Sequence, residues 1–137
     1  MTLPITTEHL ILRRFTYNDI PDIIETVTQT SVTRITSNIE PNEPGVKKFI
    51  DEKNSYHAFE KEKYFYLAIE RKEDKKVMGL LSLMYGDHKQ GAIGWSLGVS
   101  FRGKGYASEG AKALMKYAFT VLGGIFLPYT SDSTFSI

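Results

Sequence analysis

The sequence predicts an α+β fold of the three-layer type, with a mixed and mainly antiparallel sheet flanked by helices. Short runs rich in β-branched and aromatic residues are separated by polar turns in the middle of the chain. Two segments with apolar residues at helical spacing precede most of these runs, and a longer amphipathic segment follows them. Because strands joined by short turns pair antiparallel, the middle of the chain should form the sheet and the periodic segments should cover it.

Length and composition limit the classes of protein to which this chain can belong. We expect residues 1–137 to form a single domain, because a chain of 137 residues falls in the usual one-domain range. The 17 Lys and Arg nearly balance the 16 Asp and Glu, so no charge excess favours nucleic acid or an acidic membrane as partner. The sequence contains no cysteine, which excludes disulfides and fits a cytoplasmic location. No run of apolar residues reaches the ~20 that a membrane helix needs.

The first part of the chain is predicted to hold one strand and two helices. Residues 9–15 are rich in β-formers, and Thr16 with Asp19 resembles the start signature of a first helix. Residues 29–44 lack a steady period, so we expect an irregular connection that contributes to a substrate mouth. Residues 45–62 are predicted to form the second helix.

Three strands and a third helix are predicted next. We expect strands at residues 64–69, 77–83 and 92–100, the first two joined by a charged hairpin turn. Residues 107–122 carry the clearest amphipathic pattern. Glu109 falls in the first turn of that helix, where a negative charge suits the helix dipole.

The most informative chemistry lies in the loop of residues 102–107. Gly103 and Gly105 allow a sharp turn and a close approach of the backbone to a ligand. The start of the next helix presents N–H groups that lack intrahelical partners and carry partial positive charge. Arg102 and Lys104 add charge that suits a pyrophosphate. A strand-to-helix turn that merely requires glycine is the alternative interpretation.

Two other phosphate-binding motifs match only in part. Residues 98–104 satisfy the first seven positions of the nucleoside-triphosphate loop, but Gly105 stands where a magnesium-binding hydroxyl is required. Residues 103–108 begin like a dinucleotide fingerprint, but they end in Ser108, and no suitable acidic residue follows about twenty positions later. An NTPase and a dehydrogenase are therefore both disfavoured.

The pattern Arg102-x-x-Gly105-x-Ala107, between a strand and an amphipathic helix, resembles the acyl-coenzyme-A loop of the GNAT superfamily of N-acetyltransferases. The resemblance extends from Thr2 to Gly123. It is closest to the branch that acetylates the amino termini of ribosomal proteins, and it is carried by residues 7–15, 77–79, 93–97 and 102–111.

This resemblance implies an N-acetyltransferase that uses acetyl-coenzyme A (acetyl-CoA) as co-substrate, needs no metal, and acts on a primary amine of a protein amino terminus or a small molecule. It implies that the strand end holds the pantetheine arm, that loop amides hold the pyrophosphate, and that a loop cation reaches the 3′-phosphate. The cofactor-binding residues so implied are Leu97, Gly98, Val99, Arg102, Gly103, Lys104, Gly105, Tyr106, Ala107 and Ser108. Trp95 and Phe101 are expected in the core instead.

The sequence departs from the family pattern in two places. Many members carry a Glu before the Ile-Gly of the last predicted strand, where it acts through water as the base, but Ala92 stands here and no catalytic residue is identified. After Gly123 the usual strand, Asn-x-x-Ser segment, helix and final strand are not matched, although residues 124–127 offer a short version of that strand. We therefore expect a partial domain whose open edge favours a homodimer.

Three functions stay open from the sequence. The first is an active N-acetyltransferase in which water or another residue replaces the base. The second is a regulatory module that binds coenzyme A without transfer, and the third is a truncated structural remnant that oligomerises. His9, His57 and His88 lack the spacing of metal ligands, so structural or surface roles are expected for them.

Overall fold

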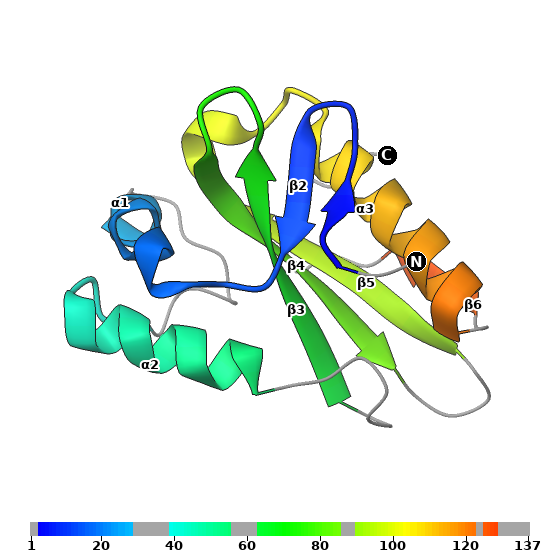
Figure 1. The fold of residues 1–137 in the computed structure, drawn as a ribbon, viewed down its shortest axis with the longest axis horizontal. Coiled ribbons are helices and arrows are strands. Elements are labelled where there is room, and N and C mark those ends of the chain that lie inside the picture. The colour runs from blue at the N-terminus through cyan, green and yellow to red at the C-terminus, as the bar shows by residue number, and fades with distance from the viewer. Residues whose placement is uncertain (1–2, 29–38, 56–62, 86–89, 123–124, 129–137) are drawn as a thin grey trace.

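A six-stranded sheet with helices on both faces forms the centre of the protein in the computed structural model (Figure 1). The structure describes residues 3–28, 39–55, 63–85, 90–122 and 125–128. The strands cross the sheet in chain order, and every neighbouring pair is antiparallel except β5 and β6, which are parallel. The strands are β1 (Ile5–Thr6), β2 (Leu10–Arg13), β3 (Lys63–Arg71), β4 (Lys76–Tyr85), β5 (Gln90–Leu97) and β6 (Ile125–Pro128). The predicted α+β class with a mixed sheet is confirmed.

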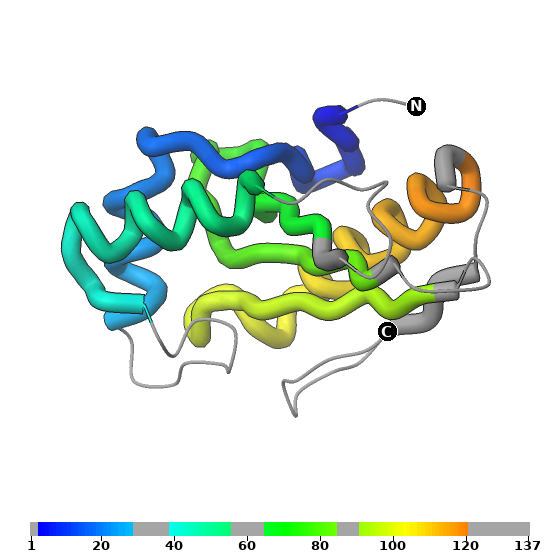
Figure 2. The backbone as a smooth tube through the Cα atoms, turned by 90° about the horizontal axis from the view of Figure 1, so that it is seen from below, coloured from blue at the N-terminus to red at the C-terminus, as the bar shows by residue number. Residues whose placement is uncertain are grey.

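The helices divide the core into two clusters, one on each face of the sheet. Helices α1 (Ile20–Thr28) and α2 (Glu43–Asn54) cover one face, and α3 (Tyr106–Tyr117) covers the other. In the two views α1 and α2 lie to the left and α3 to the right (Figures 1 and 2). Successive side chains of β4 point to opposite faces of the sheet. Leu81 packs in the cluster beneath α3 and Leu80 in the cluster beneath α1 and α2, so β4 contributes to both clusters.

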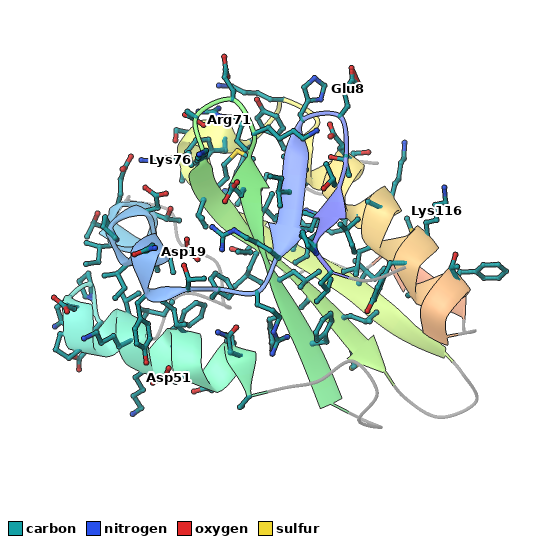
Figure 3. The ribbon with its side chains drawn as sticks, in the orientation of Figure 1. Glu8, Asp19, Asp51, Arg71, Lys76 and Lys116 are labelled. Carbon is teal, nitrogen blue, oxygen red and sulfur yellow. The ribbon has the colours of Figure 1, made fainter. Side chains whose placement is uncertain are left out.

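The predicted start of the first helix is confirmed by a capping box. The backbone N–H of Thr16 donates to Asp19 at 2.9 Å in a short 3-10 turn, η1 (Tyr17–Asp19), directly before α1. The Asp19 carboxylate is 3% exposed and accepts two hydrogen bonds from the Arg13 guanidinium, at 2.8 and 2.9 Å (Figure 3). Because a buried carboxylate requires such pairing, this contact fixes α1 against β2.

The predicted strand at residues 92–100 is too long at its carboxyl end. The N–H of Gly98 donates to the Met78 carbonyl at 2.8 Å, and the Gly98 carbonyl accepts from Phe101 at 3.0 Å. The bond from Phe101 to Gly98 closes a 3-10 turn, η3 (Val99–Phe101), so β5 ends at Leu97.

Other differences concern short elements and element ends. Strand β1 was not predicted, because two residues carry no periodicity. Helix α2 begins at Glu43, with Asn42 accepting from the Gly45 N–H at 2.8 Å, and residues 56–62 of its predicted range lie outside the described residues. Helix α3 continues into a π-helix, η4 (Ala118–Leu122), so the predicted range 107–122 is helical throughout.

The pairing of β5 with β6 covers only the first half of β5. It begins with Gln90 opposite Ile125 and ends with Ile93 opposite Pro128, whereas β5 itself continues to Leu97. The predicted short strand after α3 is therefore confirmed, and the described pairing ends at Pro128, the last described residue of β6. Among the described residues, no helix is long and apolar enough to cross a membrane.

Two glycines test how tightly the sheet and helix pack. A Cβ on Gly79 would lie 1.9 Å from the Ser96 carbonyl oxygen, so we expect Gly79→Ala to destabilise the protein by about 1–3 kcal/mol or more. A Cβ on Gly110 would lie 3.2 Å from a Leu81 methyl group, and that methyl group can shift. Alanine also favours the helix over glycine by ~1 kcal/mol. In urea unfolding, Gly110→Ala should therefore lower the free energy of unfolding much less than Gly79→Ala. Equal losses of unfolding free energy in the two variants would contradict the close approach of β4 and β5.

Candidate functional site

The predicted glycine loop lies between η3 and α3, at the end of the sheet where the turn joining β3 to β4 is also found (Figure 1). Gly103 and Gly105 have φ angles of +76° and +84°, in the left-handed region that favours glycine. A Cβ at either position would meet no atom within 4 Å. The loop thus combines a turn that requires glycine with open space beside its backbone.

The backbone amides from Gly103 to Ser108 donate no hydrogen bond within the part of the chain that the structure describes. The first bond of α3 runs from the Glu109 N–H to the Gly105 carbonyl at 3.0 Å. The preceding bond runs from the Arg102 N–H to the Val99 carbonyl at 3.3 Å. The amides between them are available at a helix N-terminus, where a bound anion is favoured.

The two loop cations have different surroundings. Arg102 is half-buried, and its Nε donates to the Leu97 carbonyl at 3.1 Å, which ties the loop to the end of β5. Lys104 is exposed and forms no ion pair with any other described residue. Lys104 is therefore the loop cation better placed to meet an external phosphate.

The other predicted residues lie next to the loop. Some of their backbone N–H and carbonyl groups already form hydrogen bonds within the protein. The Leu97 carbonyl accepts from Arg102, and Gly98 uses both its N–H and its carbonyl in the turn of η3. Val99 lies in η3, outside the strand, and is 39% exposed. Trp95 and Phe101 are buried in the core, as predicted.

Arg71 at the end of β3 contacts the aromatic residues on both sides of the loop (Figure 3). Its guanidinium carbon lies 5.3 Å from the Phe101 ring centroid and 5.9 Å from that of Tyr106. Asp74 holds the guanidinium through two hydrogen bonds of 3.0 and 2.7 Å, and this contact lowers the pKa of Asp74 to about 2. The sequence indicated only a solvated charged turn here, because spacing carries no sign of this long-range contact.

Glu109 fixes the first turn of α3 to the turn between β1 and β2. Its carboxylate accepts from the Thr7 hydroxyl, from the His9 N–H at 2.8 Å, and contacts the His9 Nδ1 at 2.8 Å. Partial burial alone would raise the pKa of Glu109, but the hydrogen bonds from Thr7 and His9 outweigh it and lower that pKa. The hydrogen bond to Glu109 raises the pKa of His9. The sequence predicted only that Glu109 lies in the first turn of the helix, where its charge suits the helix dipole.

An apolar pocket lies on the opposite face of the sheet, between α1, α2 and strands β4 and β5. Its empty volume is about 340 Å³, including space open to solvent. It is lined by Phe15, Ile23, Thr26, Val27, Phe49, Val77, Gly79, Leu80 and Ser96. The described lining residues carry two hydroxyls and no charged side chain. Because Ser96 precedes Leu97 on β5, the pocket reaches the strand that leads into the glycine loop.

The base that the family pattern places on β5 is missing at position 92. Ala92 lies opposite Met84 in the ladder of β4 and β5, and its methyl group cannot accept a proton. Within the described ranges, no group of three or more His, Asp or Glu side chains is arranged to hold a metal ion.

The strand order, the parallel pairing of β5 with β6 and the glycine loop before α3 together define a GNAT-type fold. The chain belongs to the GNAT acetyltransferase family, because the family model described as "Acetyltransferase (GNAT) domain" matches residues 9–130. It is 31% identical over 116 residues to "Uncharacterized N-acetyltransferase YnaD" from Bacillus subtilis (strain 168). That match covers 84% of this chain and 65% of the relative, so the chain spans slightly less than two thirds of the relative's length.

Two solved structures share the fold. A putative ribosomal-protein-serine acetyltransferase from Vibrio cholerae has a TM-score of 0.74 and 17% identity, over 90% of this chain and 71% of the other. RimL, described as a ribosomal L7/L12 alpha-N-protein acetyltransferase in complex with coenzyme A, has a TM-score of 0.69 and 21% identity. The RimL match covers 91% of this chain and 72% of the other. At these identities the likeness supports the fold alone.

The contact between His9 and Glu109 predicts a pH-dependent stability. The raised pKa of His9 contributes stability that is complete below its usual value of 6.5 and is lost as pH rises through the raised value. The lowered pKa of Glu109 contributes stability that is complete above 4.5 and is lost as pH falls through the lowered value. His9→Asn should therefore lower the free energy of unfolding more at about pH 5.5 than at about pH 8.5.

Denaturant unfolding at the two pH values measures this difference. Glu8→Gln is the matched control, because the Glu8 carboxylate lies 3.9 Å from the His9 ring and its side chain is 83% exposed. An equal loss at both pH values for His9→Asn would contradict an ionic contact at the start of α3.

Proposed function

We propose that this chain carries the acetyl-CoA site of an N-acetyltransferase that acts on a primary amine. The observation that carries the proposal is the run of available amides from Gly103 to Ser108, in a left-handed loop with open space beside it. Membership of the GNAT family and the likeness to a coenzyme-A-bound structure support the same ligand. The activity remains a proposal because the chain spans 65% of its curated relative.

The loop geometry suits a diphosphate. Glycines at positions 103 and 105 let the backbone approach the phosphate oxygens, which accept hydrogen bonds from the loop amides. Lys104 adds a positive charge at the exposed rim. Arg71 maintains the loop conformation by packing against Phe101 and Tyr106. The backbone of residues 97–99 stays the predicted contact of the pantetheine arm.

When bound, acetyl-CoA supplies a thioester. The amine nitrogen forms a bond to the acetyl carbon as the carbon–sulfur bond breaks. The amine loses a proton, and the thiolate sulfur gains one. The protein's part is to hold the two reactants in line and away from bulk water. Because Ala92 provides no base, we propose that the amine reaches the site neutral or loses its proton to water or to another residue.

This constraint favours an α-amino group as the acceptor. With a pKa near ~8, roughly a tenth of α-amines are neutral at pH 7, against less than about a thousandth of lysine side chains with a pKa near ~10.4. We therefore propose a protein amino terminus or a small α-amine as the substrate, and the cytoplasm as the location. The homodimer expected from the sequence stays a prediction.

A second candidate function is a module that binds coenzyme A without transfer. The absence of a base at Ala92 favours it. Both functions require the glycine loop, so they differ only in whether an amine reacts.

Thermal unfolding tests the binding site. Acetyl-CoA should raise the Tm of the wild type, since a ligand at 100 times its Kd adds about 2.7 kcal/mol to the stability of the folded state. Gly105→Val should remain folded but lose this shift, because valine strains the left-handed turn and fills the space beside it. Gly110→Ala, a core-facing glycine of the same helix, should keep the shift. A shift that persists in Gly105→Val would place the ligand elsewhere.

Release of free thiol then separates the two functions. With acetyl-CoA and an α-amine, the transferase should release thiol at a rate that rises with pH through the pKa of the amine. Binding of acetyl-CoA without amine-dependent release would favour the binding module instead.

A further inference from the structure

Ser82, in the middle of β4, carries a buried hydroxyl whose role the fold does not explain. The residue is 7% exposed, and its side chain forms no hydrogen bond within the described part of the chain. Buried polar groups are nearly always hydrogen-bonded, and one left without a partner costs about 1–3 kcal/mol. The described residues thus leave this hydroxyl, in the centre of the sheet, open to a bound partner.

The strand register shows which face this hydroxyl occupies. Leu81 and Leu83 pack in the cluster beneath α3, so Ser82 belongs to the face covered by α1 and α2. Across the sheet, Ser82 lies opposite Tyr66 on β3 and opposite Gly94 on β5. Gly94 has no side chain to offer it, and Gly94 follows Ile93, the last residue of β5 in the described pairing with β6.

Ser82 also lies between two features of the candidate acceptor side. In one direction the next cross-strand pair on this face is Leu80 with Ser96, and both of these residues line the apolar pocket. In the other direction the next pair on this face is Met84 with Ala92, the position where the family's base was expected. Diagonal neighbours such as Ser82 and Ser96 stand roughly 7–8 Å apart in a sheet. Ser82 is therefore the next residue of β4 on this face after Leu80, which lines the pocket, and it pairs with the strand that leads to the loop.

We propose that Ser82 is an acceptor-binding residue whose hydroxyl oxygen accepts an N–H of the acceptor amine. The apolar group attached to that amine then occupies the pocket between α1, α2 and the sheet. The substrate class is an α-amine whose neighbouring side chain is apolar, because the described residues that line the pocket have no charged group to meet an acidic or basic side chain. This inference rests on the proposed N-acetyltransferase function and identifies the substrate of that site.

The hydroxyl orients the amine and does not act as its base. A neutral amine can donate one N–H to Ser82 while its lone pair stays directed at the acetyl carbon. This role is useful when Ala92 supplies no carboxylate, because the arrangement of the amine must then come from hydrogen bonding and packing.

Ser82→Ala tests the proposal through stability and kinetics together. The variant should unfold at the same Tm as the wild type or above it, because it removes an unpaired polar group. The acetyl-CoA-induced rise in Tm should be unchanged. For the amine, kcat/KM should fall about 3- to 10-fold, the effect of one lost hydrogen bond. Ser100→Ala, which removes an exposed hydroxyl from η3, is the control and should leave the amine kinetics unchanged.

A pair of amines tests the pocket. Leucine amide should be acetylated with a kcat/KM at least about 10-fold above that of the α-amide of aspartic acid. Equal rates for the two amines would overturn the apolar pocket as the acceptor site. An active wild type with unchanged amine kinetics in Ser82→Ala, or a lowered Tm in that variant, would overturn the role of Ser82 while leaving the proposed function intact. A wild type that binds acetyl-CoA but acetylates no amine would overturn both.

Discussion

The amides of the left-handed loop lack acceptors within the described protein, and several long-range contacts hold them in that state. Arg71 from β3 packs on the rings at both ends of the loop, Arg102 bonds back to Leu97 at the end of β5, and Glu109 fixes the first turn of α3 to the turn between β1 and β2. Each contact comes from a different part of the sheet. The loop is thus preformed by the fold, which reduces the entropy lost when an anion binds.

The proposed positions of the two reactants lie on different parts of the sheet. The described pairing of β5 with β6 ends with Ile93 opposite Pro128, and β5 continues to Leu97 and the glycine loop. The apolar pocket and Ser82 lie on the face covered by α1 and α2, and α3 covers the other. Gly79 allows β4 to approach Ser96 closely at the edge of this pocket, so one glycine shapes both the sheet and the acceptor side.

Local signals in the sequence predicted most of the fold. The capping pair Thr16 and Asp19, the charged turn before Lys76 and the apolar stripe of α3 all act within a few residues, so each is visible in a linear sequence. The glycine loop was predicted for the same reason. The end of β5 was not, because the bond from Gly98 to the Met78 carbonyl joins residues distant in the chain.

The parts of the site that escaped prediction depend on burial or on contacts across the fold. Ser82 resembles any serine in a strand until the structure shows that its hydroxyl is buried without a partner. Arg71 was assigned to a solvated turn because its contacts with Phe101 and Tyr106 span about thirty residues. Side chains that shape a site through tertiary contacts therefore require coordinates, whereas the backbone motif proposed to bind the ligand does not.

The most direct test of the central claim is a titration of the isotope-labelled protein with coenzyme A, followed by NMR of its backbone amides. The account predicts that the largest changes in amide chemical shift fall between Gly103 and Ser108, because phosphate oxygens accept hydrogen bonds from those N–H groups. Saturable binding with its largest changes elsewhere, and with the loop amides unmoved, would contradict it.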